Sequence, residues 1–218
     1  MPDSTWIKSG NENPEQSFNL LAWVRDNRQT AIGILVIGFA IAIFGVFFYV
    51  NYSKTRETAQ KQLFIAQQLS LSGRLDEGMK QLTEVETGFS SKPEADFAIF
   101  TKGDIYFARG EFQKAITEYE KIVARKSNPD LVPYALYSMA KSYQALPDYN
   151  ASVIKFKDFL SKYPEHFLSG QTYMSLAYVY EKLNDKQNAK ETYEKVAVLF
   201  PDTQWAENAR QKLNPVKK

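Results

Sequence analysis

The stretch RGEFQKAITEY, residues 109–119, fixes the register of a unit that recurs four times along this chain. On either side of it, columns of similar residues repeat at intervals of 37 positions. Two columns contain only small residues, which are Ala66, Gly103, Ala140 and Ala177 in one and Gly78, Ala115, Ser152 and Ala189 in the other. Two further columns contain large residues, which are Leu69, Tyr106, Tyr143 and Tyr180, then Leu82, Tyr119, Phe156 and Tyr193. Columns that stay in phase across every unit indicate an internal repeat.

A unit of this kind is typical of two antiparallel helices joined by a tight turn. The small residues let the two helices approach closely, and the large residues fill the space between neighbouring units. Residues that break a helix stand between the columns, where the turn is needed, at Gly73, Gly110, Pro147 and Asn184. The predicted fold class is therefore all-α, with a solenoid of about four helix pairs.

At these residues the chain resembles the tetratricopeptide repeat family, whose motif alternates small and aromatic residues and ends in a proline. Pro164 and Pro201 match that proline. The resemblance covers residues 59–213 and is weaker in the first unit, where Leu69 and Leu82 replace aromatic residues. The family's usual period is about 34 residues. We therefore expect the extra residues of this chain in the loops that join its units.

The resemblance divides the chain into units near residues 59–94, 96–130, 133–167 and 170–202, with a cap at 203–213 that seals the last unit. The helix pairs predicted within these units are 58–71 with 75–89, 95–108 with 111–125, 133–145 with 149–162, and 169–183 with 186–199. A final helix is predicted at 204–213.

Residues 31–50, AIGILVIGFAIAIFGVFFYV, contain no charged side chain. At about 1.5 Å per residue, this run is roughly 30 Å long and matches the hydrocarbon core of a bilayer. Trp23, Tyr49 and Tyr52 stand at its two ends, where interfacial aromatic residues are common. The alternative is a cleaved signal peptide, which would have a shorter apolar region ending in a small-x-small site. The sequence therefore predicts a single transmembrane helix at 31–50 that anchors the chain in a lipid bilayer.

The remaining organisation follows from this span. Residues 1–17 are polar and are expected to form a disordered tail, and residues 18–30 an interfacial helix. Residues 51–218 form the repeat domain. No Gly or Pro lies between Val46 and Ser72, so the transmembrane helix and the first repeat helix are expected to be continuous. Charge does not fix the orientation, because three basic residues stand near each end of the span, at Lys8, Arg25 and Arg28 and at Lys54, Arg56 and Lys61.

The composition argues against several functions. The 27 basic and 25 acidic residues give a net charge of +2, so no large field of one sign favours nucleic acid. The chain has no cysteine and only one histidine, His166, which we expect to face solvent at the start of a helix. Transition-metal ligands are therefore lacking, and no phosphate-binding or catalytic motif occurs. We predict no enzyme activity, no cofactor and no metal site.

In the resemblance, the first helix of each unit forms a concave face that holds a peptide or a helix of another protein. The residues at its groove positions are Phe97, Phe100, Asp104, Phe107, Tyr134, Tyr137, Lys141, Met174 and Tyr178, together with Lys182. So many aromatic side chains on one face would be costly to leave uncovered. The alternative is that individual rings pack within the protein. The family's basic clamp for chaperone C-terminal carboxylates needs Lys and Asn, but one of its positions holds Leu63, Phe100, Tyr137 and Met174 in the four units.

The order of tail, interfacial helix, anchor and repeats resembles the ancillary subunit family of the bacterial SecYEG translocon. That resemblance implies a cytoplasmic N-terminus, a single pass through the inner membrane and periplasmic repeats. It also implies translocon subunits, periplasmic chaperones or exported chains as partners. The chain is similar in repeat type to the periplasmic cell-division coordinator, so an envelope assembly or division scaffold is a second hypothesis. A membrane-tethered cytoplasmic adaptor is a third, and it follows if the topology is inverted.

Overall fold

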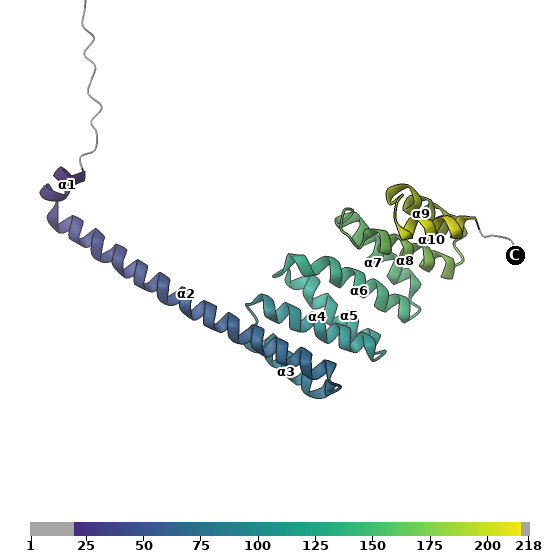
Figure 1. Ribbon diagram of the computed structural model, residues 1–218, viewed down its shortest axis with the longest axis horizontal. Helices are drawn as coiled ribbons and strands as arrows, with labels where there is room; N and C mark the ends of the chain where they lie inside the picture. The colour runs from purple at the N-terminus through teal and green to yellow at the C-terminus, as the bar shows by residue number, and fades with distance from the viewer. Residues whose placement is uncertain (1–19, 215–218) are drawn as a thin grey trace, which may run out of the picture. The chain divides into compact units, whose positions relative to one another are not determined.

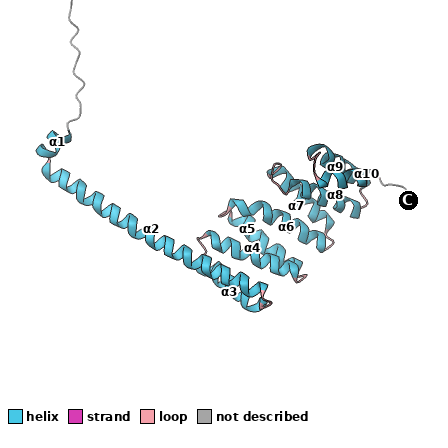
Figure 2. Ribbon diagram, viewed as in Figure 1, coloured by secondary structure: helices cyan, strands magenta, loops and turns pink. Residues whose placement is uncertain are grey.

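The computed structural model describes residues 20–214, and within this range every regular element is a helix. The helices are α1 (Leu20–Asp26), α2 (Arg28–Leu71), α3 (Leu75–Gly88), α4 (Pro93–Ala108), α5 (Phe112–Arg125), the 3-10 helix η1 (Pro129–Leu131), α6 (Val132–Ala145), α7 (Tyr149–Lys162), α8 (Ser169–Lys182), α9 (Lys186–Leu199) and α10 (Gln204–Leu213) (Figure 2). The all-α prediction is confirmed. The tail expected at 1–17 and the first two residues of the expected interfacial helix lie outside the described residues.

The chain divides into two compact units, Met1–Ser53 and Lys54–Lys218. In the first unit, α1 ends at Asp26, and Asn27 links it to α2 with a backbone hydrogen bond to Trp23 O (2.9 Å). The helix α2 contains a stretch with mean hydropathy 2.8, of which only 6% is covered by the rest of the chain. A core helix of a water-soluble domain would be mostly buried. This exposed apolar stretch is therefore the candidate membrane span.

The helix α2 runs without interruption through the stretch that lacks Gly and Pro, as expected. Its residues from Lys54 onward belong to the second unit and form the first helix of the first repeat. There, buried Ala66 packs with Leu82 and Val85 of α3. The other repeats are the pairs α4 with α5, α6 with α7, and α8 with α9, and α10 packs on α9 (Figure 1). Apart from the start predicted at residue 58, which lies inside the continuous α2, all helix ends within the repeats lie within two residues of the predicted positions.

Burial explains the recurring columns. All eight residues of the two small columns are buried. The hydroxyl group of Ser152 donates a hydrogen bond to the carbonyl oxygen of Ala140 (2.8 Å), which is possible only because α6 and α7 lie close together. The four large residues that include Leu82 and Tyr119 are also buried, and each lies in the hydrophobic core of its repeat. The period read from the sequence is thus the period of the packing.

The turns within the repeats use the predicted residues. Gly73 and Gly110 have φ of 84° and 77°, and Asn184 has φ of 58°. Residues other than Gly and Asn rarely adopt this left-handed conformation. In each of these turns the next residue donates its backbone N–H to a carbonyl five positions earlier, as from Glu111 to Tyr106 O (2.9 Å). This bond ends the first helix and redirects the chain into the second.

Candidate functional site

Three hollows follow one another along the first helices of the repeats, and together they form a surface that we call the groove. The first, of about 480 Å³, lies between α2 and α4 and includes Leu71 and Thr101. The second, of about 260 Å³, lies between α4 and α6 and includes Phe107 and Ser138. The third, of about 290 Å³, lies between α6 and α8 and includes Met174. The hollows lie on the helices for which the repeat resemblance predicts a concave binding face.

Two charged residues join these hollows into a row. Asp104 of α4 lines both the first and the second hollow. Lys141 of α6 lines both the second and the third. The two residues are 37 positions apart and therefore occupy equivalent places in adjacent repeats. A partner that extends along the groove would meet both.

Six of the nine predicted groove residues line the hollows, which are Asp104, Phe107, Tyr137, Lys141, Met174 and Tyr178. Phe97, Phe100 and Tyr134 do not. Phe97 is 42% exposed, and the other two are half-buried. The side chain of Lys182 lies over the ring of Tyr178, with its nitrogen 5.2 Å from the ring centroid. The predicted set thus contains residues that line the hollows and residues that do not, and its role in binding stays a prediction.

Some of the predicted rings pack within the protein. Phe100 lies 5.4 Å from Tyr119, measured between ring centroids, and belongs to the core of the second repeat. Tyr137 lines the second hollow but also packs on Phe156 (5.9 Å), in the core of the third repeat. These contacts are the packing alternative that the sequence left open. Mutation of either ring would therefore disturb the packing of its repeat.

The environment of His166 differs from the solvent-facing position that the sequence predicted. It is half-buried rather than solvent-facing, and its ring lies 5.3 Å from that of Tyr134 and 5.6 Å from that of Phe159. The Leu168 N–H donates a hydrogen bond to its Nδ1 (3.2 Å). Burial lowers the pKa of His166. The imidazole is therefore part of an aromatic cluster beside the loop between α7 and α8.

Hydroxyl residues line the groove that were not anticipated. Thr101, Ser138 and Ser175 contribute to the first, second and third hollows respectively. They stand 37 positions apart, directly after the column that contains Phe100 and Tyr137. A recurring small polar residue next to an aromatic column was the signal for them. These hydroxyl groups add hydrogen-bond donors and acceptors to the groove.

Desolvation dominates the electrostatics of the two groove charges. The neighbouring side chains that shield the Asp104 carboxyl group from water raise its pKa, and the hydrogen bond that it accepts from the Tyr119 hydroxyl group (2.7 Å) opposes this shift only in part. Burial lowers the pKa of Lys141, whose Nζ donates to Gln144 Oε1 (3.1 Å). Each shift favours the neutral form of its group. An opposite charge from a ligand would offset the desolvation that disfavours the charged form of each group.

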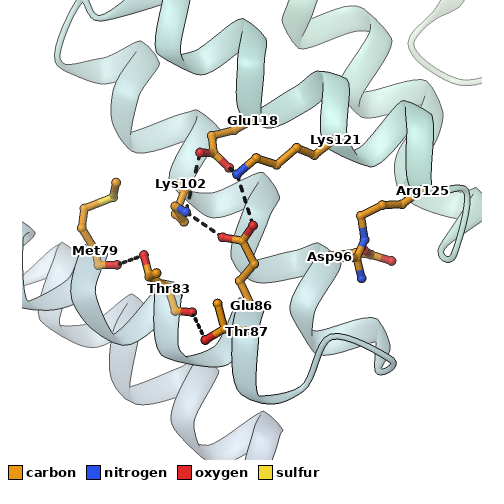
Figure 3. A network of polar contacts seen from close by, with 9 residues as sticks. All are labelled: Met79, Thr83, Glu86, Thr87, Asp96, Lys102, Glu118, Lys121 and Arg125. Atoms are coloured by element: carbon orange, nitrogen blue, oxygen red, sulfur yellow. Dashed lines mark hydrogen bonds and ion pairs between the residues drawn. The ribbon is translucent and has the colours of Figure 1, made fainter.

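A separate polar cluster, none of whose residues lines these hollows, is fully paired. The Lys102 ammonium group lies 2.7 Å from Glu86 Oε2 and 3.6 Å from Glu118 Oε1, and Lys121 bridges the same two carboxylates (Figure 3). Lys102 and Glu118 are only 6% and 7% exposed. The carboxylates come from α3 and α5, and Lys102 comes from α4. The cluster therefore joins the first repeat to the second, and it leaves no charge free for a ligand.

Within residues 20–214, no group of three or more histidine, aspartate or glutamate side chains is placed to hold a metal ion. The groove also lacks the arrangement of a nucleophile beside a base that acyl transfer requires. What it offers is an elongated surface with apolar hollows, hydroxyl groups and two separate charges. Such a surface suits a segment of another protein better than a small reactive substrate.

Comparison with known proteins agrees with the repeat fold. The sequence profile of the tetratricopeptide repeat-like domain family matches residues 22–151, and that of an outer membrane lipoprotein family matches residues 92–218. The chain therefore belongs to the tetratricopeptide repeat-like family, and from residue 92 onward it is also of the outer membrane lipoprotein type. No curated protein sequence matches it.

Several solved structures share the fold. A tetratricopeptide repeat protein from Parabacteroides merdae superimposes with a TM-score of 0.61 at 16% identity, over 72% of this chain and 59% of that one. A putative kinesin light chain from Podosopora anserina, with nearly identical TPR-like repeats, gives 0.58 at 18% identity, over 72% and 84%. MamA from Desulfovibrio magneticus RS-1 gives 0.56 at 19% identity, over 71% and 81%. At these identities the likeness shows the fold alone.

Proposed function

We propose that this chain is a membrane-anchored scaffold of the bacterial cell envelope that binds segments of other proteins in its groove. The observation that carries the proposal is the unbroken row of three hollows on the first helices of the repeats, joined by Asp104 and Lys141. Repeat stacks use such surfaces for proteins rather than for chemistry. The chain accordingly acts as an interaction protein and not as an enzyme.

The envelope setting rests on two independent features. One is the match of residues 92–218 to an outer membrane lipoprotein family. The other is the exposed apolar stretch of α2, which provides a membrane anchor at residues 31–50. Together they favour an inner-membrane protein with a cytoplasmic N-terminus and repeats in the periplasm. The partners are then periplasmic chaperones, newly exported chains or subunits of the translocon.

Two other functions remain open within this proposal. An envelope assembly or cell-division scaffold is supported by the same repeat type and by the lipoprotein match. A membrane-tethered cytoplasmic adaptor follows if the orientation is the reverse. These three functions share the groove and differ in the compartment and in the identity of the partner.

Site-specific photocrosslinking in living cells tests the groove and identifies what fills it. The crosslinking residue p-benzoylphenylalanine is placed at Thr101, in the first hollow, or at Thr117, on the exposed surface of α5. The two sites are matched, because each threonine bonds only the carbonyl four residues earlier in its own helix. We expect covalent products from Thr101 and not from Thr117. Translocon subunits or chaperones in these products support the first function, and division or assembly proteins support the second. Equal amounts of crosslinked product from both sites would contradict the proposal that the groove is the binding site.

A further inference from the structure

Buried charges in the repeats are paired with one another. Asp96 is 1% exposed and lies 2.8 Å from Arg125. Lys102 is shared between Glu86 and Glu118. This is the usual arrangement, because an unpaired charge that is removed from water destabilises the fold. Against this background, a charge that lines a hollow and has no ionic partner is informative.

Asp104 and Lys141 are such charges. They line the same hollow between α4 and α6, yet they form no ion pair with each other or with any other residue in the described range 20–214. The polar partners of both are neutral, the Tyr119 hydroxyl group for Asp104 and the Gln144 amide for Lys141. Arg109, which also lines the first hollow, is engaged by Asp76 at 3.0 Å. Among the residues that line the three hollows, Asp104 and Lys141 are thus the carboxylate and the ammonium group that are available to a ligand.

The positions of these charges define an order along the groove. Asp104 stands between the first and second hollows, and Lys141 stands between the second and third. Between them the second hollow is walled by the rings of Phe107 and Tyr137. A segment that lies along the groove therefore meets a negative charge, an aromatic hollow and a positive charge in turn.

From this order we infer that the partner is an extended segment in which a basic side chain binds Asp104, an acidic side chain binds Lys141, and an apolar side chain between them enters the second hollow. The inference rests on the proposed function, and it adds the order of the partner's charges along the groove. Packed helices lie on the order of 10 Å apart. An extended chain advances about 3.3 Å per residue, so the two charged residues of the partner stand about three positions apart.

A segment with a single charge fits the groove less well. A basic side chain in the second hollow would face Lys141 as well as Asp104, and an acidic one would face Asp104 as well as Lys141. Like charges brought together in this way oppose binding, which is how charged surfaces exclude wrong partners. The pKa directions of the two groups agree, because an opposite charge from the partner would offset the desolvation that now disfavours the charged form of each.

Selection of peptides on the full chain tests the inference. The protein is placed in lipid nanodiscs and used to select from random dodecapeptides displayed on phage, after removal of phage that bind empty nanodiscs. The selection is repeated on the charge-swapped variant Asp104→Lys with Lys141→Asp. The matched control swaps an exposed pair on α9, Lys190→Glu with Glu194→Lys, whose charged atoms lie 3.7 Å apart.

We expect the wild type and the control to enrich peptides with a basic and an acidic residue about three positions apart. Peptides from the charge-swapped variant should show the reverse order. A peptide selected on the wild type should bind the charge-swapped variant at least about tenfold more weakly, and a peptide selected on that variant should bind the wild type more weakly by a similar factor. The same charge order from both proteins, or enrichment of uncharged peptides, would overturn the inference and leave the groove as a binding site. If no peptide is enriched over empty nanodiscs, or if Thr101→Trp in the first hollow weakens none of them, the proposed function fails as well.

The charge swap also removes the bond between Tyr119 and Asp104, so helical circular dichroism is recorded for every variant. A second variant, Lys141→Gln, keeps this bond. Peptides selected on it should retain the basic residue and lose the acidic one. An acidic residue retained in those peptides would overturn the assignment of Lys141.

Discussion

The ring of Tyr119 lies directly against the backbone of Gly103, so that a Cβ atom on Gly103 would stand 2.5 Å from Cε1 of the ring. Two further ring atoms would lie within 3.0 Å of it. The ring itself is held in place, because it is buried and its hydroxyl group is bonded to Asp104. The glycine of this small column is therefore required by the contact between α4 and α5.

Gly103→Ala is expected to destabilise the protein. Alanine would improve helix propensity by about 1 kcal/mol, but overpacking typically costs about 1 to 3 kcal/mol. Because the ring cannot move away, we expect the overpacking to win and the free energy of unfolding to fall by about 1 kcal/mol or more. Denaturant titration followed by circular dichroism measures this change.

Gly88→Ala provides the control for this substitution. Gly88 is the last residue of α3, and no atom lies within 4 Å of its Cβ position. This variant should be as stable as the wild type or slightly more stable. Equal losses at the two glycines would mean that the contact with Tyr119 is not what selects glycine at position 103.

The cluster around Lys102 is expected to make the repeats sensitive to acid. Burial alone would raise the pKa of Glu86, but hydrogen bonds and charge interactions with Lys102 and Lys121 outweigh it and lower the pKa below the usual 4.5. A carboxyl group whose pKa is lower in the folded state stabilises the protein above the unfolded pKa, and this stabilisation is lost as the pH falls through the folded pKa. Stability should therefore decline below about pH 4.5.

Glu86→Gln isolates this contribution. Above about pH 5 the variant should be less stable than the wild type, and the difference should shrink steadily as the pH falls towards 3. Urea denaturation at a series of pH values measures both curves. The exposed pair of Lys190 and Glu194 provides the control, since Glu194→Gln should change stability by less than about 1 kcal/mol throughout. A difference for Glu86→Gln that is constant with pH would show that the effect is not electrostatic.

The repeat architecture was accessible from the sequence because every structural position is sampled several times. Close helix contact selects small residues at Ala66 and at the equivalent positions of the other units. A unit whose own residues match the motif poorly can therefore still be recognised from its spacing to the other units. The turns were equally clear, since few residues tolerate the backbone conformation of Gly73 and Gly110. The 3-10 helix η1 was not foreseen, because it lies in a loop between units where the repeat imposes no pattern.

The groove was only partly accessible, since the sequence gives the face of a helix but not the direction of a long side chain. Phe100 occupies a groove position, yet its ring turns back onto Tyr119 of the second helix in the same repeat. Lys102 stands in a column that is otherwise apolar, and its partners Glu86 and Glu118 lie sixteen residues away on either side. The sequence around Lys102 contains no pattern that predicts this cluster. The direction of the Phe100 ring and the pairing of Lys102 both depend on contacts between helices, which the sequence pattern does not specify.

Asp104→Asn is expected to stabilise the protein while weakening its function. The pKa of Asp104 is raised in the folded state, so folding disfavours its charge at neutral pH. An amide oxygen can still accept the hydrogen bond from Tyr119. Because Asp104 remains partly exposed to water, the gain at pH 7 should be below about 1 kcal/mol. It should disappear below about pH 3.8, where aspartate is already neutral in the unfolded chain. Denaturation at pH 7 and pH 3 measures the gain in the free energy of unfolding. Crosslinking from Thr101 measures the accompanying loss of partner binding.

The orientation of the membrane span can be tested with C-terminal fusions. Alkaline phosphatase folds only outside the cytoplasm and green fluorescent protein exported by the same route stays dark, so we expect an active phosphatase fusion and a dark fluorescent one. The basic residues near the two ends of the span are balanced, with Arg25 and Arg28 before it and Lys54 and Arg56 after it. Changing Arg25 and Arg28 to Gln should therefore tip the balance and lower phosphatase activity, because basic residues favour the cytoplasmic side. Changing Lys54 and Arg56 to Gln should preserve it. An inactive phosphatase fusion together with a fluorescent one would place the repeats in the cytoplasm and leave the tethered adaptor as the function of this chain.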